Sequence, residues 1–161
     1  MVKEFEIASN SEAETKEIAK KTAQLLRSGD IIVLDGDLGA GKTHFVKGFA
    51  EGFHCGDPVT SPTFSIANFY RTDVSNILHI DLYRISTIDE FNDLGLVDYY
   101  SQSIVIIEWG KKFAVYFEEY LLISFKINDD NTRILTFAGY GNKYGSIFDE
   151  LKHILKEKQS C

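Results

Sequence analysis

The chain has 161 residues and a formal net charge of −7, and 44% of its residues are hydrophobic. That length suits one domain with its own core and is short for two, so we expect a single domain over residues 1–161. No apolar run is long enough for a membrane span and the N-terminal segment does not resemble a signal peptide, so we expect a cytoplasmic protein with no membrane contact. The acidic balance disfavours a chain that binds polyanions by itself.

The N-terminal part of the chain alternates strand and helix patterns. Residues 2–7 alternate weakly in hydrophobicity and predict a strand, and the cap-type residues at 9–12 predict a helix that runs to about Arg27. Residues 31–34 form a short, continuous apolar run, which is typical of a strand buried on both faces. After a loop, a pattern with one apolar face predicts a helix over residues 42–52.

The rest of the chain adds strands, a hairpin and two helices. The patterns predict, in order, strands at 64–70 and 77–82, a short helix at 85–94, a strand at 103–107, hairpin strands at 121–127 and 133–138, and a last helix at 145–156. Alternating strands and helices are typical of a three-layer α/β fold, and tight turns near Asp73 and Asp129 add antiparallel pairs. We therefore predict a mixed sheet that is parallel at its centre.

A glycine-rich loop lies between the strand at 31–34 and the helix at 42–52. It matches the pattern G-x-x-x-x-G-K-[ST] at every fixed position, and its residues are Gly36, Asp37, Leu38, Gly39, Ala40, Gly41, Lys42 and Thr43. Glycines let consecutive backbone amides point at one spot, and the N-terminus of the following helix adds unpaired N–H groups and a positive dipole end. The pattern therefore predicts a P-loop NTPase fold in which Lys42 reaches the β- and γ-phosphates and the Thr43 hydroxyl binds magnesium.

Two carboxylates follow apolar strands at the place where an open α/β sheet binds its ligands. Asp81 follows residues 77–80 and Glu108 follows residues 104–107, so both lie at carboxyl ends of strands. One of them can bind the metal or its water while the other positions the attacking water. His79 shares a strand face with Asp81, so a His/Asp metal pair is an alternative, although the sequence supplies it with no further ligands.

Other residues near these motifs fit two interpretations each. The hydroxyl groups of residues 60–63 lie where nucleotide switches sense the γ-phosphate, and they fit a turn fixed by Pro62 equally well. His44 fits packing on the helix better than contact with phosphate. Three arginines are candidates for offsetting transition-state charge, although each also fits a surface ion pair: Arg71, Arg84 and Arg133.

Four stretches in this order resemble one protein family: GDLGAGKTHF, VTSPTFSIANFY, HIDLYRI and VIIEWG. Together they make the chain similar to the TsaE family, also called YjeE, of small bacterial P-loop ATPases in the tRNA threonylcarbamoyladenosine pathway. The resemblance covers nearly the whole chain, and SPTF, DLYR and IEW at these separations are more specific than the phosphate loop. One departure is His44, where the family usually has Thr or another small residue.

The resemblance implies ATP as the nucleotide and Mg²⁺ as its metal. The glycine-rich loop would wrap the phosphates, and Thr43 and Glu108 would be the magnesium ligands. Asp81 would stand in the position of a second carboxylate that is important for hydrolysis. Residues 60–64 would form a switch-like loop, and Arg133 is similar in placement to a family residue close to the nucleotide.

The resemblance also implies two partner proteins, TsaD and TsaB. TsaD transfers the threonylcarbamoyl group to adenosine next to the anticodon, and the ATPase would reset that complex. The chain would then contact tRNA only indirectly, which fits its acidic charge. Hydrolysis by the isolated chain would be slow if a partner completes the site.

Two other classes of protein share the phosphate loop. A small-molecule kinase would normally need an arginine-rich lid and an acceptor pocket, and this sequence has no arginine cluster. A nucleotide-dependent binding switch that uses GTP would read guanine with an N-K-x-D segment, whereas the residues at 142–145 are Asn-Lys-Tyr-Gly and lack the Asp.

Overall fold

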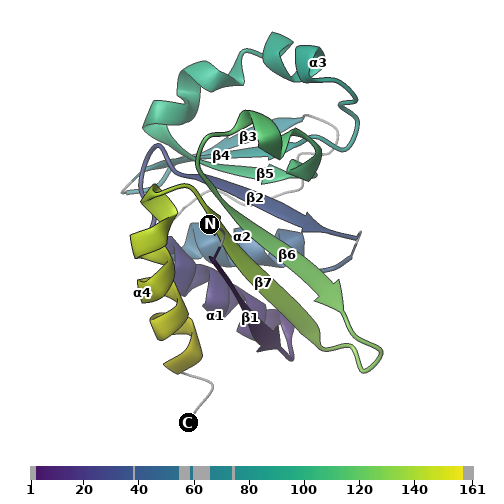
Figure 1. Ribbon diagram of the computed structural model, residues 1–161, viewed down its shortest axis with the longest axis vertical. Coiled ribbons are helices and arrows are strands. Elements are labelled where there is room, and N and C mark those ends of the chain that lie inside the picture. Colours follow the sequence, from purple (N-terminus) through teal and green to yellow (C-terminus); the bar gives the residue numbers. More distant parts are fainter. Residues whose placement is uncertain (1–2, 38, 55–58, 60–65, 74, 158–161) are drawn as a thin grey trace.

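In the part of the chain that the structure describes, a single sheet of seven strands forms the centre of the molecule (Figure 1). The computed structural model describes residues 3–37, 39–54, 59, 66–73 and 75–157. Within them the strands are β1 (Lys3–Ser9), β2 (Ile31–Gly36), β3 (Ala67–Tyr70), β4 (Asn76–Asp81), β5 (Ser103–Glu108), β6 (Tyr120–Ile127) and β7 (Arg133–Tyr140).

The strand order is β1-β7-β6-β2-β5-β4-β3. The middle of the sheet is parallel, because β2 pairs with both β5 and β6 and β5 pairs with β4 in parallel registers. The pairs β3–β4, β6–β7 and β1–β7 are antiparallel. The prediction of a mixed, centrally parallel sheet is confirmed. As a result, β2, β4 and β5 end at the same edge of the sheet, and the residues that follow them meet there.

Helices cover both faces of the sheet and form the predicted three layers (Figure 1). They are α1 (Glu12–Ala23), α2 (Lys42–Gly52), α3 (Ile88–Asp93) and α4 (Lys143–Glu157), together with the 3₁₀ helices η1 (Leu96–Gln102) and η2 (Lys111–Tyr116). Apolar residues of α1, α2 and α4 pack on one face against strand residues such as Ile32 and Ile104. The other face, which includes Leu78 and Val105, is covered by residues of α3, η1 and η2.

The N-terminal ends of α1 and α3 are set by capping side chains. α1 begins after Ser11, whose side chain accepts a hydrogen bond from the backbone N–H of Glu14, and α3 begins after Thr87 in the same way. α1 ends at Ala23, earlier than predicted, and α3 begins at Ile88, later than predicted. The sequence did not predict η1 and η2, because short 3₁₀ turns carry no long hydrophobic period.

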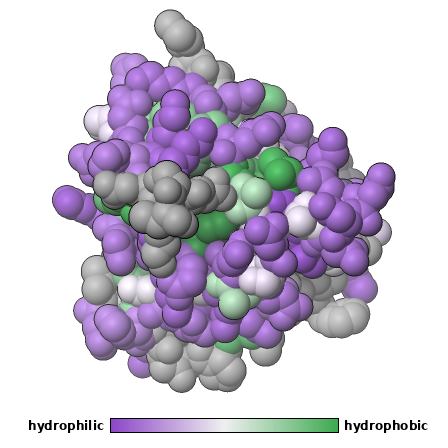
Figure 2. Space-filling model, turned by 90° about the horizontal axis from the view of Figure 1, so that it is seen from below, coloured by the Kyte–Doolittle hydropathy of each residue, from purple (hydrophilic) through white to green (hydrophobic). Residues whose placement is uncertain are grey.

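The surface contrasts with this apolar interior. Seen from below, the molecule is mainly hydrophilic, with a smaller hydrophobic area near the middle of that face (Figure 2). Among the helices that the structure describes, none combines the length and the apolar character that crossing a membrane requires.

Candidate active site

The glycine-rich loop joins the end of β2 to the start of α2. Gly36, Gly39 and Gly41 all have positive φ angles, of 142°, 79° and 107° respectively, which L-residues with a side chain rarely adopt. Gly41 is the N-cap of α2, and the helix has neither a side-chain cap nor an acidic residue in its first turn. The positive end of the helix dipole therefore faces the loop without a side-chain anion of its own, which suits a bound phosphate.

Lys42 lies deep in this loop. Its side chain is buried, its Nζ donates to the carbonyl oxygen of Gly36 at 2.6 Å, and the same Nζ lies 3.9 Å from the centre of the Trp109 ring. Burial lowers the pKa of Lys42 below its ordinary value, although the nearby carboxylates of Glu108 and Asp35 act in the opposite direction. The loop thus holds a poorly solvated cation. Attraction to an anionic ligand would offset the free-energy cost of burying that charge.

Asp81 and Glu108 are brought together by the parallel pairing of β4 and β5, in which they are register partners. Both are buried, at 5% and 4% exposure, which is unusual for carboxylates without partners. An oxygen of Asp81 accepts a hydrogen bond from the backbone N–H of Tyr83 at 2.8 Å. An oxygen of Glu108 lies 2.6 Å from Nε2 of His79. Each carboxylate therefore has a hydrogen-bonding neighbour that limits its orientation.

A cavity of about 300 Å³ unites most of the predicted site residues. It is lined by Glu12, Gly39, Gly41, Lys42, Thr43, His44, Asp81, Glu108, Trp109 and Arg133. Arg133 comes from β7, at the far side of the loop, and its Nε donates to the carbonyl oxygen of Ala40 at 3.1 Å. The arginine therefore holds the loop by a hydrogen bond and also lines the cavity.

Among the described loop residues, Gly36, Asp37 and Ala40 do not line this cavity. Gly36 is behind the Lys42 ammonium, and Asp37 is exposed, with a carboxylate near enough to affect the pKa of Lys42. Leu38 lies outside the described residues, as do residues 60–64 of the predicted switch-like segment. Neither of these predictions is tested by the structure.

Three residues in the cavity wall were not among the predicted site residues: Glu12, His44 and Trp109. His44 contacts Glu12 of α1 at 3.1 Å between Nε2 and Oε1, so it joins the two helices rather than only packing. Trp109 has a φ of 60° and its ring lies 5.1 Å from that of Tyr83. Its place directly after Glu108 was a usable sequence signal, whereas Glu12 offered none because only tertiary packing brings α1 to the loop.

The side chains in the cavity fit a divalent ion held by Thr43 and Glu108 better than one held by the alternative pair of ligands, His79 and Asp81. The described part of the chain contains no group of three or more His, Cys, Asp or Glu side chains that could hold a metal by themselves. His79, the histidine of the alternative His/Asp pair, contacts Glu108 instead. A hydroxyl and a carboxylate, Thr43 and Glu108, suit magnesium, which usually completes its shell with phosphate oxygens and water.

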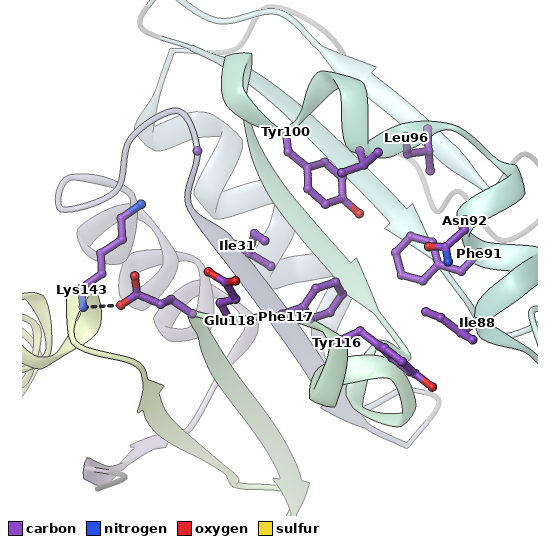
Figure 3. A pocket seen from close by; sticks show the side chains of 13 residues that line it. Ile31, Ile88, Phe91, Asn92, Leu96, Tyr100, Tyr116, Phe117, Glu118 and Lys143 are labelled. Carbon is purple, nitrogen blue, oxygen red and sulfur yellow. Dashed lines mark hydrogen bonds between the residues drawn. The ribbon is translucent and has the colours of Figure 1, made fainter.

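A larger cavity, of about 660 Å³, lies on the other face of the sheet. Figure 3 shows Phe91, Tyr100 and Phe117 around this space, with Ile88 and Lys143 at opposite ends of it. Its wall contains neither the glycine-rich loop nor the Asp81 and Glu108 carboxylates. The smaller cavity contains the charged and hydroxyl side chains that phosphate chemistry requires, so we assign the site to it despite its size.

Comparisons with known proteins find relatives that match most of this chain. Residues 9–135 match the family model described as threonylcarbamoyl adenosine biosynthesis protein TsaE. The tRNA threonylcarbamoyladenosine biosynthesis protein TsaE of Bacillus subtilis (strain 168) is 44% identical over 140 residues, which are 86% of this chain and 87% of that protein. The protein of the same name from Rickettsia typhi is 38% identical over 145 residues, or 88% of this chain and 97% of its own. A crystal structure of Bacillus subtilis YdiB matches with a TM-score of 0.79 at 37% identity, and the match covers 95% of this chain and 97% of that one.

Proposed function

The chain belongs to the TsaE family of tRNA threonylcarbamoyladenosine biosynthesis, and we propose that in this pathway it is the subunit that hydrolyses ATP. The observation that carries the proposal is the cavity in which Lys42, Thr43 and Arg133 meet Asp81 and Glu108. Cations and backbone amides on one side and carboxylates on the other are what a magnesium-bound triphosphate requires.

The chain's own residues divide the work of phosphoryl transfer among them. The loop from Gly36 to Thr43 offers backbone amides to the phosphates, and Lys42 moves its ammonium from the Gly36 carbonyl to the β- and γ-phosphates. Asp81 orients the attacking water, because its carboxylate is buried and held by the Tyr83 N–H at the rim of the same cavity. Arg133 stabilises the loop through Ala40 and adds positive charge beside the phosphates.

Thr43 and Glu108 are the residues that would hold magnesium. The ion would neutralise negative charge on the β- and γ-phosphates. Neither Thr43 nor Glu108 carries the positive charge that this requires. Glu108 is buried and already oriented by its contact with His79, so it needs little reorganisation to act as a ligand.

Membership of this pathway supports a proposal about partner proteins. We propose that it acts with TsaD and TsaB, and that tRNA is reached only through that complex. The net charge of −7 supports the indirect route, because affinity for polyanions depends on cationic contacts to phosphates. A partner that completes the site would make hydrolysis by the isolated chain slow.

A kinase remains the main alternative, and the position of the second cavity argues against it. A phosphate acceptor must lie next to the γ-phosphate, in line with the leaving group. The 660 Å³ cavity lies across the sheet from the glycine-rich loop, so it is not an acceptor pocket for this site.

An ATPase assay on the isolated chain and on its mixture with TsaD and TsaB tests the proposal. We expect slow, magnesium-dependent release of phosphate from ATP by the isolated chain and faster release with both partners. Lys42→Ala should abolish this turnover, because the ammonium that balances the γ-phosphate is gone.

Two controls make the result specific. The Lys42→Ala chain should retain the circular dichroism and the cooperative unfolding of the wild type, which shows that lost turnover is not lost folding. Products should be examined by mass spectrometry, since a phosphorylated small molecule in place of free phosphate would favour the kinase. Undiminished turnover by Lys42→Ala would contradict the assigned site.

A further inference from the structure

A completely buried histidine lies directly behind Glu108. His79 in β4 is 0% exposed, and its Nε2 is 2.6 Å from Oε2 of the Glu108 carboxylate. In the parallel pairing of β4 with β5, His79 is opposite Ile106 and Asp81 is opposite Glu108. His79 therefore lies two residues before Asp81, further from the edge of the sheet than the two carboxylates and on the same face as Asp81. It does not line the cavity itself.

The other side of the imidazole ring has its own partner. The hydroxyl of Tyr70 in β3 lies 3.5 Å from Nδ1 of His79, and Nδ2 of Asn68 donates to that hydroxyl at 3.3 Å. These contacts are all satisfied when Tyr70 donates to Nδ1 and the Nε2–H of a neutral His79 donates to Glu108. A line of polar side chains thus connects the edge strand β3 with the carboxylate through the interior of the sheet.

We propose that His79 is a positioning residue that fixes the orientation of the Glu108 carboxylate for the magnesium nucleotide. This inference rests on the proposed function, in which Glu108 is a magnesium ligand. A glutamate side chain has several rotamers, and a donor held rigidly in the core selects one of them before the ion arrives. Partners of this kind commonly contribute about tenfold or more to metal affinity or activity.

The environment of His79 supports a positioning role over simple core packing. Its neighbours on the same face of the sheet, Ile77 in β4 and Ile106 in β5, are apolar and completely buried. An apolar residue at position 79 would fill the space without requiring hydrogen-bond partners. The imidazole instead uses one nitrogen on Glu108 and the other on Tyr70.

Two matched substitutions separate positioning from packing. His79→Gln places an amide N–H near the position of Nε2 and can still donate to Glu108. His79→Asn is also a buried primary amide, but it is shorter and its N–H lies near the position of Nδ1, too far from Glu108. Both variants replace the ring by a primary amide of lower volume, and they differ mainly in whether that amide reaches Glu108.

Affinity for ADP, measured by calorimetry with and without Mg²⁺, provides a readout that does not depend on hydrolysis. We expect His79→Asn to reduce the Mg²⁺-dependent gain in ADP affinity by about tenfold and His79→Gln to reduce it less. Affinity for ADP without Mg²⁺ should stay the same in both. In a Glu108→Gln background, His79→Asn should cause no additional loss, because the group that it positions is already altered.

Several outcomes would overturn the inference. Equal behaviour of the Gln and Asn variants would assign His79 to packing, as would full additivity with Glu108→Gln. If both variants fail to fold, long-range ¹H–¹⁵N NMR of the wild type decides: a neutral ring protonated at Nε2 that responds to Mg²⁺·ADP supports the inference, and protonation only at Nδ1 contradicts it.

The two proposals fail in different ways. If the wild type hydrolyses ATP, Lys42→Ala does not, and the His79 variants bind Mg²⁺·ADP like the wild type, the function stands and the positioning role is wrong. If the wild type neither binds nor hydrolyses ATP, the proposed function is wrong and the inference fails with it.

Discussion

Lys42 is placed where it suits the site but where burial of its charge lowers the stability of the fold. Its ammonium is buried beside the Gly36 carbonyl and the Trp109 ring, and burial lowers its pKa. A lowered pKa means that the folded state holds the charged form less well than the unfolded state does. Stability should therefore increase as the pH rises from the lowered pKa toward the ordinary value of 10.5.

This gives a prediction about stability rather than activity. Lys42→Met keeps most of the side-chain length and removes the charge, so we expect its urea midpoint at pH 7 to equal or exceed that of the wild type. Lys47→Met in the same helix is the control, and it should change the midpoint little. A clearly lower midpoint for Lys42→Met alone would show that the ammonium stabilises the fold, contrary to the direction of its pKa.

Asp81 carries a second prediction at the residue scale. We expect Asp81→Ala to reduce the rate of ATP hydrolysis by about 100-fold while changing nucleotide affinity much less, because the carboxylate acts on water rather than on the phosphates. Asp81→Asn keeps an oxygen that can accept from the Tyr83 N–H, so it separates the loss of charge from the loss of that hydrogen bond. Parallel measurement of kcat and of ADP binding decides, and equal loss of both would make Asp81 a binding ligand instead.

At the scale of elements, the close contact between α1 and α2 holds the helix that carries the phosphate loop. A Cβ atom at Gly48 would lie 2.5 Å from the backbone oxygen of Lys16, and one at Gly52 would lie 3.1 Å from that of Lys20. Glycines on one side of α2 thus let the backbones approach each other. This packing also brings Glu12, at the start of α1, to the wall of the cavity.

The close approach predicts that Gly48→Ala is destabilising, although alanine is the better helix former. The added methyl group must push α1 away, and we expect the free energy of unfolding to fall by about 1–3 kcal/mol. Gly145→Ala in α4 is the matched control, because a Cβ there meets nothing within 4 Å. The control should be neutral or stabilising by up to about 1 kcal/mol. Urea unfolding of the two variants tests this, and similar values for both would refute the packing argument.

At the scale of the whole molecule, the partly buried Tyr100 and the buried Tyr144 contribute to how the fold responds to alkaline pH. Burial raises the pKa of Tyr100 to about 12. Burial and the neighbouring Asp30 carboxylate also raise the pKa of Tyr144, whose hydroxyl donates to Asp30 and accepts from the Ile31 N–H. Both groups favour the folded state while they are protonated.

The sign of this effect can be tested. The unfolded chain loses the Tyr100 proton near pH 10 and the folded chain near pH 12, so stability should fall as the pH rises between these values. Tyr100→Phe removes that contribution, and its free energy of unfolding should fall less steeply than that of the wild type over the same range. Urea titrations at several pH values measure both slopes, and identical slopes would contradict the raised pKa.

The sequence by itself determined the local parts of this protein. The glycine-rich loop with Lys42 and Thr43, and the carboxylates of Asp81 and Glu108 at the ends of apolar strands, follow from residue order alone, because strand, loop and helix are adjacent in the chain. The centrally parallel sheet followed from the same alternation and is confirmed. The start of α1 was predictable from its cap-type residues, whereas its end at Ala23 was not, because the C-cap residue Gln24 makes only backbone contacts there.

Only the tertiary structure decided which distant residues complete the site. The register of β4 against β5 sets His79 against Glu108, the antiparallel β7 brings Arg133 to Ala40, and the packing of α1 brings Glu12 to the cavity. Hydrophobic periods report which face of an element is buried, but they carry no information about which side chain of another element it meets. Those contacts depend on pairing register and helix approach, which arise when the whole chain packs.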